Sequence, residues 1–361
     1  MESRGRRVYL IFPVLVMLVV GVAYFFGWDI GAKLHPDITA YSLPELAEMV
    51  NEQIDAGATG GSFYVLGVTK EEIDNINQSL CGINGVVSRY SIIENGRKGM
   101  KIVLEYEISD NYYVYHKYRD GYGIPGDRAA AIKLYDKVVE ILDMIIEEDM
   151  TDYEKELAIH DYIVCNCKYG YTDYSKEYAY RAYGALVQKT AVCNGYAEAM
   201  ALLLDCVGIE NEIVTGTADG ELHAWNRVCL DGKWYQVDAT WDDPIPDRGY
   251  NAAHIFFNVT DDIMGVSHEW NREGYESCDS VDYNYFHKSN LVCDINGFKN
   301  EVKRVAQGNI NGVIEALVTD YDEARYNMEF VSEIPGVLYI QYTVQPFGEN
   351  QVVTIFLNER D

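Results

Sequence analysis

The chain has 361 residues, of which 48% are hydrophobic, so it is long enough to form two or three domains with a sizeable core. Its formal net charge of −28 argues against a nucleic-acid partner, because binding to phosphates requires a basic surface. The eight cysteines are too sparse for a disulfide scaffold, although a compartment outside the cytoplasm would permit disulfides.

The N-terminus differs from the rest of the chain in charge and hydropathy. Three arginines in residues 1–7 precede residues 8–28, VYLIFPVLVMLVVGVAYFFGW, which carry no charge. A helix of this length spans a hydrocarbon core of about 30 Å. The positive-inside rule then predicts a cytoplasmic segment 1–7, a transmembrane anchor 8–28 and an extracytoplasmic remainder. A cleaved signal peptide is the alternative, but its apolar region is typically about 7–15 residues long.

Residues 42–125, after a linker over 29–41, are expected to form an N-terminal α+β accessory region. The sequence SLPE places Ser42 and Glu45 in a capping box, which predicts a helix up to about Ile54. SFYVLGV reads as a strand, and VVSRYSII and MKIVLEYEI flank a turn at Asn95-Gly96, which predicts a hairpin.

The central region, residues 126–285, begins with two expected helices. Apolar residues from Ile132 to Ile146 recur at helical spacing, which predicts an amphipathic helix. TDYE then supplies a second capping box, Thr151 with Glu154, for a helix that runs to about Cys165. A tyrosine-rich loop follows. The remaining residues, 286–361, are predicted to form a small α+β module with a helix over GFKNEVKRVAQG and strands over YNMEFV, GVLYIQYTV and QVVTIFLN.

The stretch TAVCNGYAEAMALLLDCVG places two cysteines on one predicted helix. Asn194-Gly195 favours a turn, and Gly208 is a suitable residue to end the helix, so Cys193 lies at or just before its start. The helix dipole there favours a thiolate and lowers the pKa of a thiol. Cys206 lies at the opposite end, where the dipole opposes a thiolate. Cys193 is therefore the candidate nucleophile, and Cys206 is expected to be a packed thiol.

A second stretch, ELHAWNRVCLDGKWYQVDATW, predicts a hairpin that turns at Asp231-Gly232. If Leu230 pairs with Lys233, His223 and Asp238 become diagonal neighbours on one face of the sheet. A carboxylate in that position can orient an imidazole and stabilise its charged form. A structural polar pair is the alternative interpretation, and the cysteine at a helix start upstream favours the catalytic one.

These segments resemble the core of the transglutaminase-like superfamily, particularly its bacterial members. The resemblance covers about Thr151 to Trp270 and rests on AYGALVQKTAVCNGYAEAMALLLDCVGIENEIVTG, HAWNRV, KWYQVDATWDDP and FFNVTDDIMGVSHEW. It implies a papain-like α+β core, in which a nucleophile helix packs on an antiparallel sheet. It also implies a Cys-His-Asp triad, which corresponds here to Cys193, His223 and Asp238.

Several further residues are candidates for the substrate cleft or are expected to be structural. Tyr183 and Tyr196 could assist an oxyanion or pack in the core, and Trp225 and Trp241 could line the cleft or pack. Asp242 and Asp243 follow the triad aspartate and read as a solvated turn. Two further histidines are expected to be structural: His254 and His268. No cofactor is expected, and no metal requirement is predicted, since no EF-hand pattern is present.

The expected function is therefore that of a membrane-anchored, extracytoplasmic enzyme that acts on amides of proteins or peptides, with cell-wall proteins among the candidate substrates. Acyl transfer would proceed through a thioester, with hydrolysis favoured slightly over cross-linking because an open cleft admits water. The alternative from another class is a non-enzymatic cell-surface module that uses the same fold for binding. The presence of all three triad residues argues against that alternative.

Overall fold

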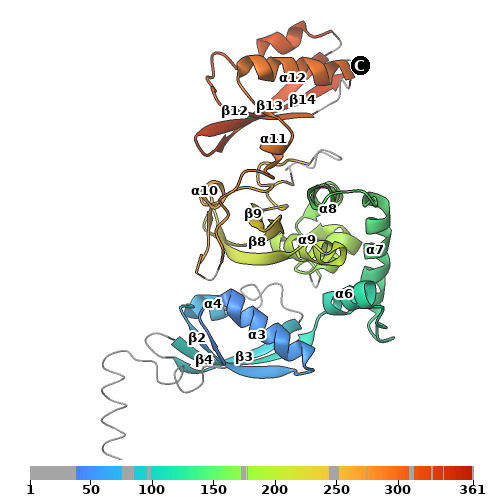
Figure 1. The fold of residues 1–361 in the computed structure, drawn as a ribbon, viewed down its shortest axis with the longest axis vertical. Coiled ribbons are helices and arrows are strands. Elements are labelled where there is room, and N and C mark those ends of the chain that lie inside the picture. The colour runs from blue at the N-terminus through green and yellow to red at the C-terminus, as the bar shows by residue number, and fades with distance from the viewer. Residues whose placement is uncertain are drawn as a thin grey trace, which may run out of the picture. The chain divides into compact units, whose positions relative to one another are not determined.

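The computed structural model describes residues 38–74, 85–95, 99–171, 176, 178–243, 252–273, 275–308, 313–326, 328–335 and 337–359. The protein combines helices and sheets, as the predicted α+β class requires, and divides into two compact units (Figure 1). The first unit contains the described residues up to Tyr112 together with Arg272–Tyr275. The second contains Tyr113–Asn271 and Glu276–Asp361.

The predicted membrane anchor over residues 8–28 lies outside the described residues, and it stays a prediction. Within the part of the chain that the structure describes, no helix is both long enough and apolar enough to cross a membrane.

The first unit is a four-stranded sheet with the strand order β1-β2-β4-β3 and a core on one face. Helix α3 begins after the N-cap Ser42, whose hydroxyl accepts a hydrogen bond from the Glu45 amide, as predicted. The predicted hairpin is confirmed by the antiparallel pairing of β3 with β4, while its turn, residues 96–98, lies outside the described residues. The elements of this unit are β1 (Thr39–Ala40), α3 (Leu43–Asp55), β2 (Gly60–Leu66), α4 (Lys70–Asp74), β3 (Gly85–Asn95) and β4 (Gly99–Ile108).

The second unit begins with helices that surround one central helix. Helix α6 (Asp110–Asp120), which spans the boundary between the units, was not predicted; α7 (Ala129–Ile145) and α8 (Asp152–Asn166) were. The capping box of α8 is complete, because Thr151 and Glu154 each accept a hydrogen bond from the other's backbone N–H. These helices bury their apolar faces around α9 (Cys193–Val207), and α9 ends at Gly208 in a left-handed conformation.

The face of α9 opposite these helices packs on an antiparallel sheet with the order β10-β7-β8-β9 (Figure 1). The strands are β7 (Asn211–Ala218), β8 (Glu221–Leu230), β9 (Lys233–Val237) and β10 (His268–Glu269). Leu230 pairs with Lys233 across the turn at Asp231-Gly232, which confirms the predicted register. A helix packed on an antiparallel sheet is therefore the centre of this unit.

Short elements connect the parts of this unit. They are β5 (Lys168–Tyr169), the π-helix η2 (Gly184–Gln188), β6 (Thr190–Ala191), α10 (Asp261–Met264) and α11 (Tyr285–Lys288). The parallel pair β5 and β6 joins the end of α8 to the segment just before α9. This pairing fixes the chain immediately before Cys193.

The C-terminal part of the second unit is a sheet with the order β11-β12-β14-β13, and α12 covers one of its faces (Figure 1). Its elements are β11 (Val292–Cys293), α12 (Ile295–Gly308), β12 (Val313–Val318), η3 (Glu329–Glu333), β13 (Val337–Phe347) and β14 (Asn350–Glu359). The predicted helix and the last two strands are confirmed. The strand predicted over YNMEFV is wrong, because Met328 adopts a positive φ of 58° and a 3-10 helix follows it. The strand β12 was not predicted.

Gly216 lies on β7, where it makes room for the backbone of the neighbouring strand β10. A Cβ at position 216 would lie 2.2 Å from the backbone oxygen of Glu269 and 3.0 Å from the ring of Trp225. We expect Gly216→Ala to lower the free energy of unfolding by about 1–3 kcal/mol, since backbone cannot yield as a flexible side chain can. Gly123→Ala is the control, because a Cβ there meets nothing within 4 Å. Chemical denaturation measures both, and equal stability of the two variants would contradict the prediction.

Candidate active site

Cys193 occupies the first position of α9, after the N-cap Val192. The side chain is 4% exposed, so it lies just beneath the surface. Two contacts hold the preceding loop against this helix: Asn194 Nδ2 donates to the backbone oxygen of Tyr180 at 2.8 Å, and Arg181 pairs with Glu198 at 2.7 Å. The helix N-terminus thus presents the thiol together with N–H groups that favour an anion.

His223 on β8 and Asp238, directly after β9, are in contact. Nε2 of His223 lies 2.7 Å from Oδ2 of Asp238. The Cys193 side chain contributes to the raised pKa of His223, which places the thiol close to the imidazole. The three residues predicted to act together are therefore brought together by α9, β8 and the turn after β9.

Buried charge shapes the protonation of this group. Burial lowers the pKa of His223, but the charge of Asp238 and the hydrogen bonds to Asp238 and Cys193 outweigh burial and raise the pKa to about 10. Burial raises the pKa of Asp238, but the charges of the two imidazoles and their hydrogen bonds hold it well below its usual range. Asp238 is therefore an anion and His223 an imidazolium at neutral pH.

A second histidine shares the Asp238 carboxylate, and the sequence did not reveal it. Nε2 of His268, on β10, lies 3.0 Å from the same Oδ2 that His223 contacts, and the His268 ring is buried. The other oxygen, Oδ1, accepts hydrogen bonds from the backbone N–H groups of Thr240 at 2.9 Å and Trp241 at 3.2 Å. Both carboxylate oxygens are thus used to fix the position of Asp238.

The two tryptophans suggested for the cleft have different surroundings. Trp225 is 1% exposed, stacks beside His223 with ring centroids 6.0 Å apart, and donates its N–H to Gln236 at 2.7 Å. It therefore supports the imidazole from inside the core. Trp241 is half-buried, contacts the rings of His223 and His268, and lines a cavity of about 550 Å³. Trp241 therefore lies between this cavity and the His223 imidazole.

The two tyrosines suggested for the oxyanion have different environments. Tyr196 is 1% exposed, and its hydroxyl donates to Asp243. Tyr183 is half-buried and packs against Tyr178 with ring centroids 4.5 Å apart. A tyrosine that the sequence did not single out, Tyr169, is half exposed, and the charges of Cys193 and Asp238 contribute, after burial, to its raised pKa.

The interpretation of Asp242 and Asp243 as a solvated turn is wrong. Both are buried, since β9 and the following turn fold inward and their carboxylates find partners within the core. Asp242 Oδ2 lies 3.2 Å from Nε2 of His160 on α8, a residue that the sequence did not single out. Asp242 also accepts hydrogen bonds from the Phe256 N–H at 3.0 and 3.2 Å.

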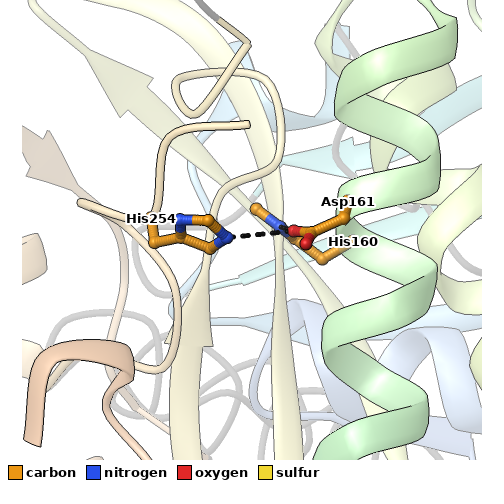
Figure 2. Close-up of side chains that lie close together, drawn as sticks. All are labelled: His160, Asp161 and His254. Carbon is orange, nitrogen blue, oxygen red and sulfur yellow. Dashed lines mark hydrogen bonds and ion pairs between the residues drawn. The ribbon is translucent and has the colours of Figure 1, made fainter. Parts of the chain in front are cut away.

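His160 belongs to a second histidine and carboxylate cluster (Figure 2). Oδ1 of Asp161 lies 3.0 Å from Nδ1 of His160 and 3.0 Å from Nε2 of His254. The remaining nitrogen of His254, Nδ1, lies 3.0 Å from Oε2 of Glu315 on β12. His254 is thus held by the rest of the fold, as expected for a structural histidine.

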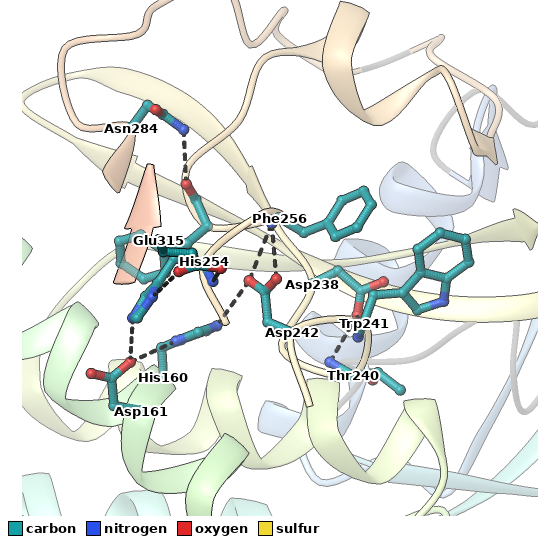
Figure 3. Close-up of polar contacts among 11 residues, drawn as sticks. His160, Asp161, Asp238, Thr240, Trp241, Asp242, His254, Phe256, Asn284 and Glu315 are labelled. Carbon is teal, nitrogen blue, oxygen red and sulfur yellow. Dashed lines mark hydrogen bonds and ion pairs between the residues drawn. The ribbon is translucent and has the colours of Figure 1, made fainter. Parts of the chain in front are cut away.

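Figure 3 shows that this second cluster continues to the turn that carries the Asp238 carboxylate. The path runs from His160 to Asp242, and the Asp242 N–H donates to the backbone oxygen of Asp238 at 3.1 Å. The same turn places Thr240 and Trp241 against the Asp238 side chain. The position of the Asp238 carboxylate therefore depends on contacts with α8 as well as on the sheet.

This arrangement has the parts needed for nucleophilic catalysis. An imidazole between a thiol and a buried carboxylate can hold the thiol proton, and the carboxylate stabilises the resulting charge. Backbone N–H groups at the start of a helix can stabilise an oxyanion. A candidate active site therefore lies at the N-terminus of α9.

Comparison with known proteins supports the family resemblance over this part of the chain. Residues 139–239 match the model of the transglutaminase-like superfamily, and this segment contains Cys193, His223 and Asp238. The human kyphoscoliosis peptidase is 27% identical over 133 residues, which cover 33% of this chain and 20% of the human protein. The mouse protein of the same name is 25% identical over 133 residues, with the same coverage. The chain thus matches about a fifth of the length of these relatives.

Similar solved structures include a protein described as a TGase, which is 20% identical, with a TM-score of 0.26 over 50% of this chain and 51% of that chain. The periplasmic domain of TgpA from Pseudomonas aeruginosa is 13% identical, with a TM-score of 0.23 over 44% of this chain and 67% of that chain. The resemblance to the transglutaminase-like superfamily is confirmed by the sequence match over residues 139–239.

The contact between His223 and Asp238 predicts an unusual titration. In the folded protein His223 should stay protonated through neutral pH and lose its proton near pH 10. Asp238→Asn removes the charge that raises the pKa, so burial then holds it at or below the ordinary value of about 6.5. His268→Gln is the matched control, because it contacts the same oxygen but leaves the Asp238 charge in place. Histidine NMR titration measures all three; an unchanged His223 pKa in Asp238→Asn would refute the assignment of its cause.

Proposed function

We propose that the chain is a transglutaminase-like cysteine enzyme that transfers acyl groups from amides of proteins or peptides, with Cys193 as the nucleophile. The observation that carries this proposal is the 2.7 Å contact between His223 and the buried Asp238, close to Cys193 at the first position of α9. The superfamily match over residues 139–239 supports the same reaction class.

In the proposed mechanism His223 holds the proton of the Cys193 thiol, and the thiolate attacks the carbonyl carbon of an amide. The new C–S bond gives a tetrahedral oxyanion, which the backbone N–H groups at the start of α9 stabilise. Collapse breaks the C–N bond, and the imidazolium of His223 gives its proton to the leaving amine. A thioester between the acyl group and Cys193 remains, and Asp238 stabilises the charged imidazole before this step.

The second half of the reaction decides between hydrolysis and cross-linking. Water that attacks the thioester gives a carboxylic acid, whereas an amine that attacks it gives a new amide; in both cases His223 accepts the proton and the thiol is restored. We favour hydrolysis, since water is in great excess over amines at an accessible cleft. The name of the human relative, kyphoscoliosis peptidase, supports this preference.

The cavity beside Trp241 is the proposed place for a substrate side chain next to the reacting amide. It measures about 550 Å³, and its lining includes Trp241 and Ile255 together with Val344 of β13 and Phe356 of β14. Trp241 also contacts His223, so a side chain in this cavity would lie next to the imidazole. The mixed lining fits a polypeptide better than a highly charged ligand.

The proposed location is extracytoplasmic, with residues 8–28 as the membrane anchor. This rests on the uncharged run and on the arginines that precede it. The substrates would then be proteins or peptides at the cell surface, including those associated with the cell wall.

Cys193→Ala should lower turnover by about four orders of magnitude or more, because a covalent intermediate cannot form without the thiol. Cys229→Ala is the matched control: Cys229 is a half-buried cysteine on β8, the strand that also carries His223, and its variant should keep activity. Circular dichroism checks that both variants fold. Full activity of Cys193→Ala would contradict the proposal. A peptide that binds the unsubstituted chain but is never turned over would favour the binding-module alternative.

A peptide library incubated with the full chain, with and without an added primary amine, separates the two outcomes of the thioester. We expect mass spectrometry to detect chain cleavage or deamidation as the main product, with amine incorporation as a minor product. The Cys193→Ala variant should give neither. Amine incorporation that exceeds hydrolysis would overturn the preference for hydrolysis and leave the nucleophile assignment intact.

A further inference from the structure

The cluster formed by His160, Asp161 and His254 has no part in the proposed acyl transfer. We propose that it is a binding site for a divalent transition metal ion of the zinc type, which fastens three segments of the second unit together. One nitrogen from each ring and one carboxylate oxygen lie within 4.8 Å of one another (Figure 2). Two imidazoles and a carboxylate form a donor set that suits zinc, whereas calcium and magnesium prefer oxygen ligands alone.

The distances between the donor atoms fit a single small ion. Nδ1 of His160 and Nε2 of His254 each lie 3.0 Å from Oδ1 of Asp161. Donor atoms about 2.0–2.1 Å from a tetrahedral zinc ion lie about 3.3 Å from one another. These two pairs need to part by only a few tenths of an ångström to admit the ion, and the nitrogens of the two rings lie within 4.8 Å of each other. The two rings, whose centroids are 5.6 Å apart, already face the same oxygen.

The far nitrogens of both rings are held by carboxylates. Nε2 of His160 lies 3.2 Å from Asp242, and Nδ1 of His254 lies 3.0 Å from Glu315. Histidines that bind metals almost always donate their second N–H to a carboxylate, a carbonyl or water, which fixes the ring and increases its basicity. Each ring here therefore has the outer partner that a metal-binding histidine needs.

The charge of the cluster also favours a cation. Three carboxylates surround two imidazoles: Asp161, Asp242 and Glu315. When both rings are neutral and act as ligands, the three ionised carboxylates give the group a charge of −3, and a divalent ion would reduce it to −1; binding of the ion would displace protons from the rings.

The cluster of His223, Asp238 and His268 has similar spacing but different outer partners. There His223 lies close to the Cys193 thiol, and Nδ1 of His268 lies 2.9 Å from the Ser267 hydroxyl. Neither outer partner is a carboxylate. The geometry therefore points to the His160 cluster as the metal site and leaves the other to catalysis.

A route to the site exists through a cavity of about 680 Å³, which Asp161, His254 and Glu315 line. The side chain of Asp161 is 42% exposed, so the ion could enter from this side and keep a water molecule as its fourth ligand. The ligands come from α8 and from the loop before α10, and Glu315 comes from β12. A bound ion would thus link the helical layer, the loop that packs on Asp242 and the C-terminal sheet.

The test measures zinc binding to the full chain after treatment with a chelator. Equilibrium dialysis with elemental analysis should give one zinc ion per chain at micromolar free zinc, and the melting temperature should rise with zinc. Cobalt(II) alone should give a visible absorption spectrum typical of a tetrahedral or five-coordinate site with nitrogen and oxygen ligands. Binding of zinc only through thiolates, visible as intense sulfur-to-cobalt absorption, would overturn the proposal.

Variants locate the site. His254→Gln and Asp161→Asn should each weaken zinc binding by about 100-fold, and Glu315→Gln by about 10–100-fold, as expected for an outer partner. Asp161→Asn is the decisive variant, because its side chain is partly exposed and its replacement spares the core. His223→Gln, in the other cluster, is the matched control and should bind zinc as tightly as the unsubstituted chain.

Two results would overturn the proposal. One is a full chain that binds no stoichiometric zinc at micromolar concentration. The other is zinc affinity that is unchanged in folded Asp161→Asn and is lost in His223→Gln, which would place the ion at the catalytic cluster instead. Because binding and melting temperature are measured without a substrate, the result is independent of whether Cys193 is catalytic.

Discussion

The buried carboxylate of Asp238 is the constraint on which the site depends. It is 0% exposed, and an isolated ionised carboxylate in a protein interior would cost several kcal/mol. Oδ2 is shared by two imidazoles, and Oδ1 accepts two backbone hydrogen bonds. These partners come from β8, from β10 and from the turn after β9. The Asp238 charge is stabilised only when all three segments are in place. The need to pair this buried carboxylate therefore holds β8, β10 and the turn after β9 together.

The buried charge of Asp238 also determines the protonation state of His223. Without Asp238, burial would favour the neutral ring; with it, the imidazolium is stable well above neutral pH. Trp225 supports one side of the ring, and its own N–H is bonded to Gln236, so the support is rigid. A fixed imidazole close to a thiol can accept the thiol proton during an attack on a carbonyl carbon. The reactivity proposed for Cys193 thus originates in a residue at the far side of the imidazole.

The sequence was sufficient to predict those parts of the site that depend on residues close together in the chain, such as hairpin turns and helix starts. The turn at Asp231-Gly232 fixes the register of β8 with β9, and that register brings His223 to Asp238. Helix propensity and Gly208 locate α9, but its start was placed by a turn predicted at Asn194-Gly195, and that turn is wrong because both residues lie inside the helix and Val192 is an N-cap without a side-chain hydrogen bond. The helix starts at Ser42 and Thr151 follow from capping boxes.

The sequence was insufficient where contacts join distant segments or where one residue breaks a pattern. His268 reaches Asp238 because β10 pairs with β7, and two-residue strands carry no periodic signal. His160 and Asp242 are separated by 82 residues, so no spacing rule connects them, and the acidic pair after Asp238 therefore read as solvated. Met328 reads as part of a strand, but its positive φ ends the extended conformation. Local sequence patterns cannot reveal any of these features, because tertiary contacts between distant residues determine them.

The two histidine clusters are joined through one turn, so a displacement in one cluster is transmitted to the other. Asp238 and Asp242 lie on the same turn, linked by a backbone hydrogen bond, and each carboxylate faces a different imidazole. Movement of α8 or of β12 would disturb His160 or His254 and, through Asp242, the Asp238 carboxylate. Because both carboxylates of this turn are buried and hydrogen-bonded, a shift of the turn would break contacts in both clusters. The rigidity that a fixed triad requires therefore comes from the second cluster, outside the residues that would touch a substrate.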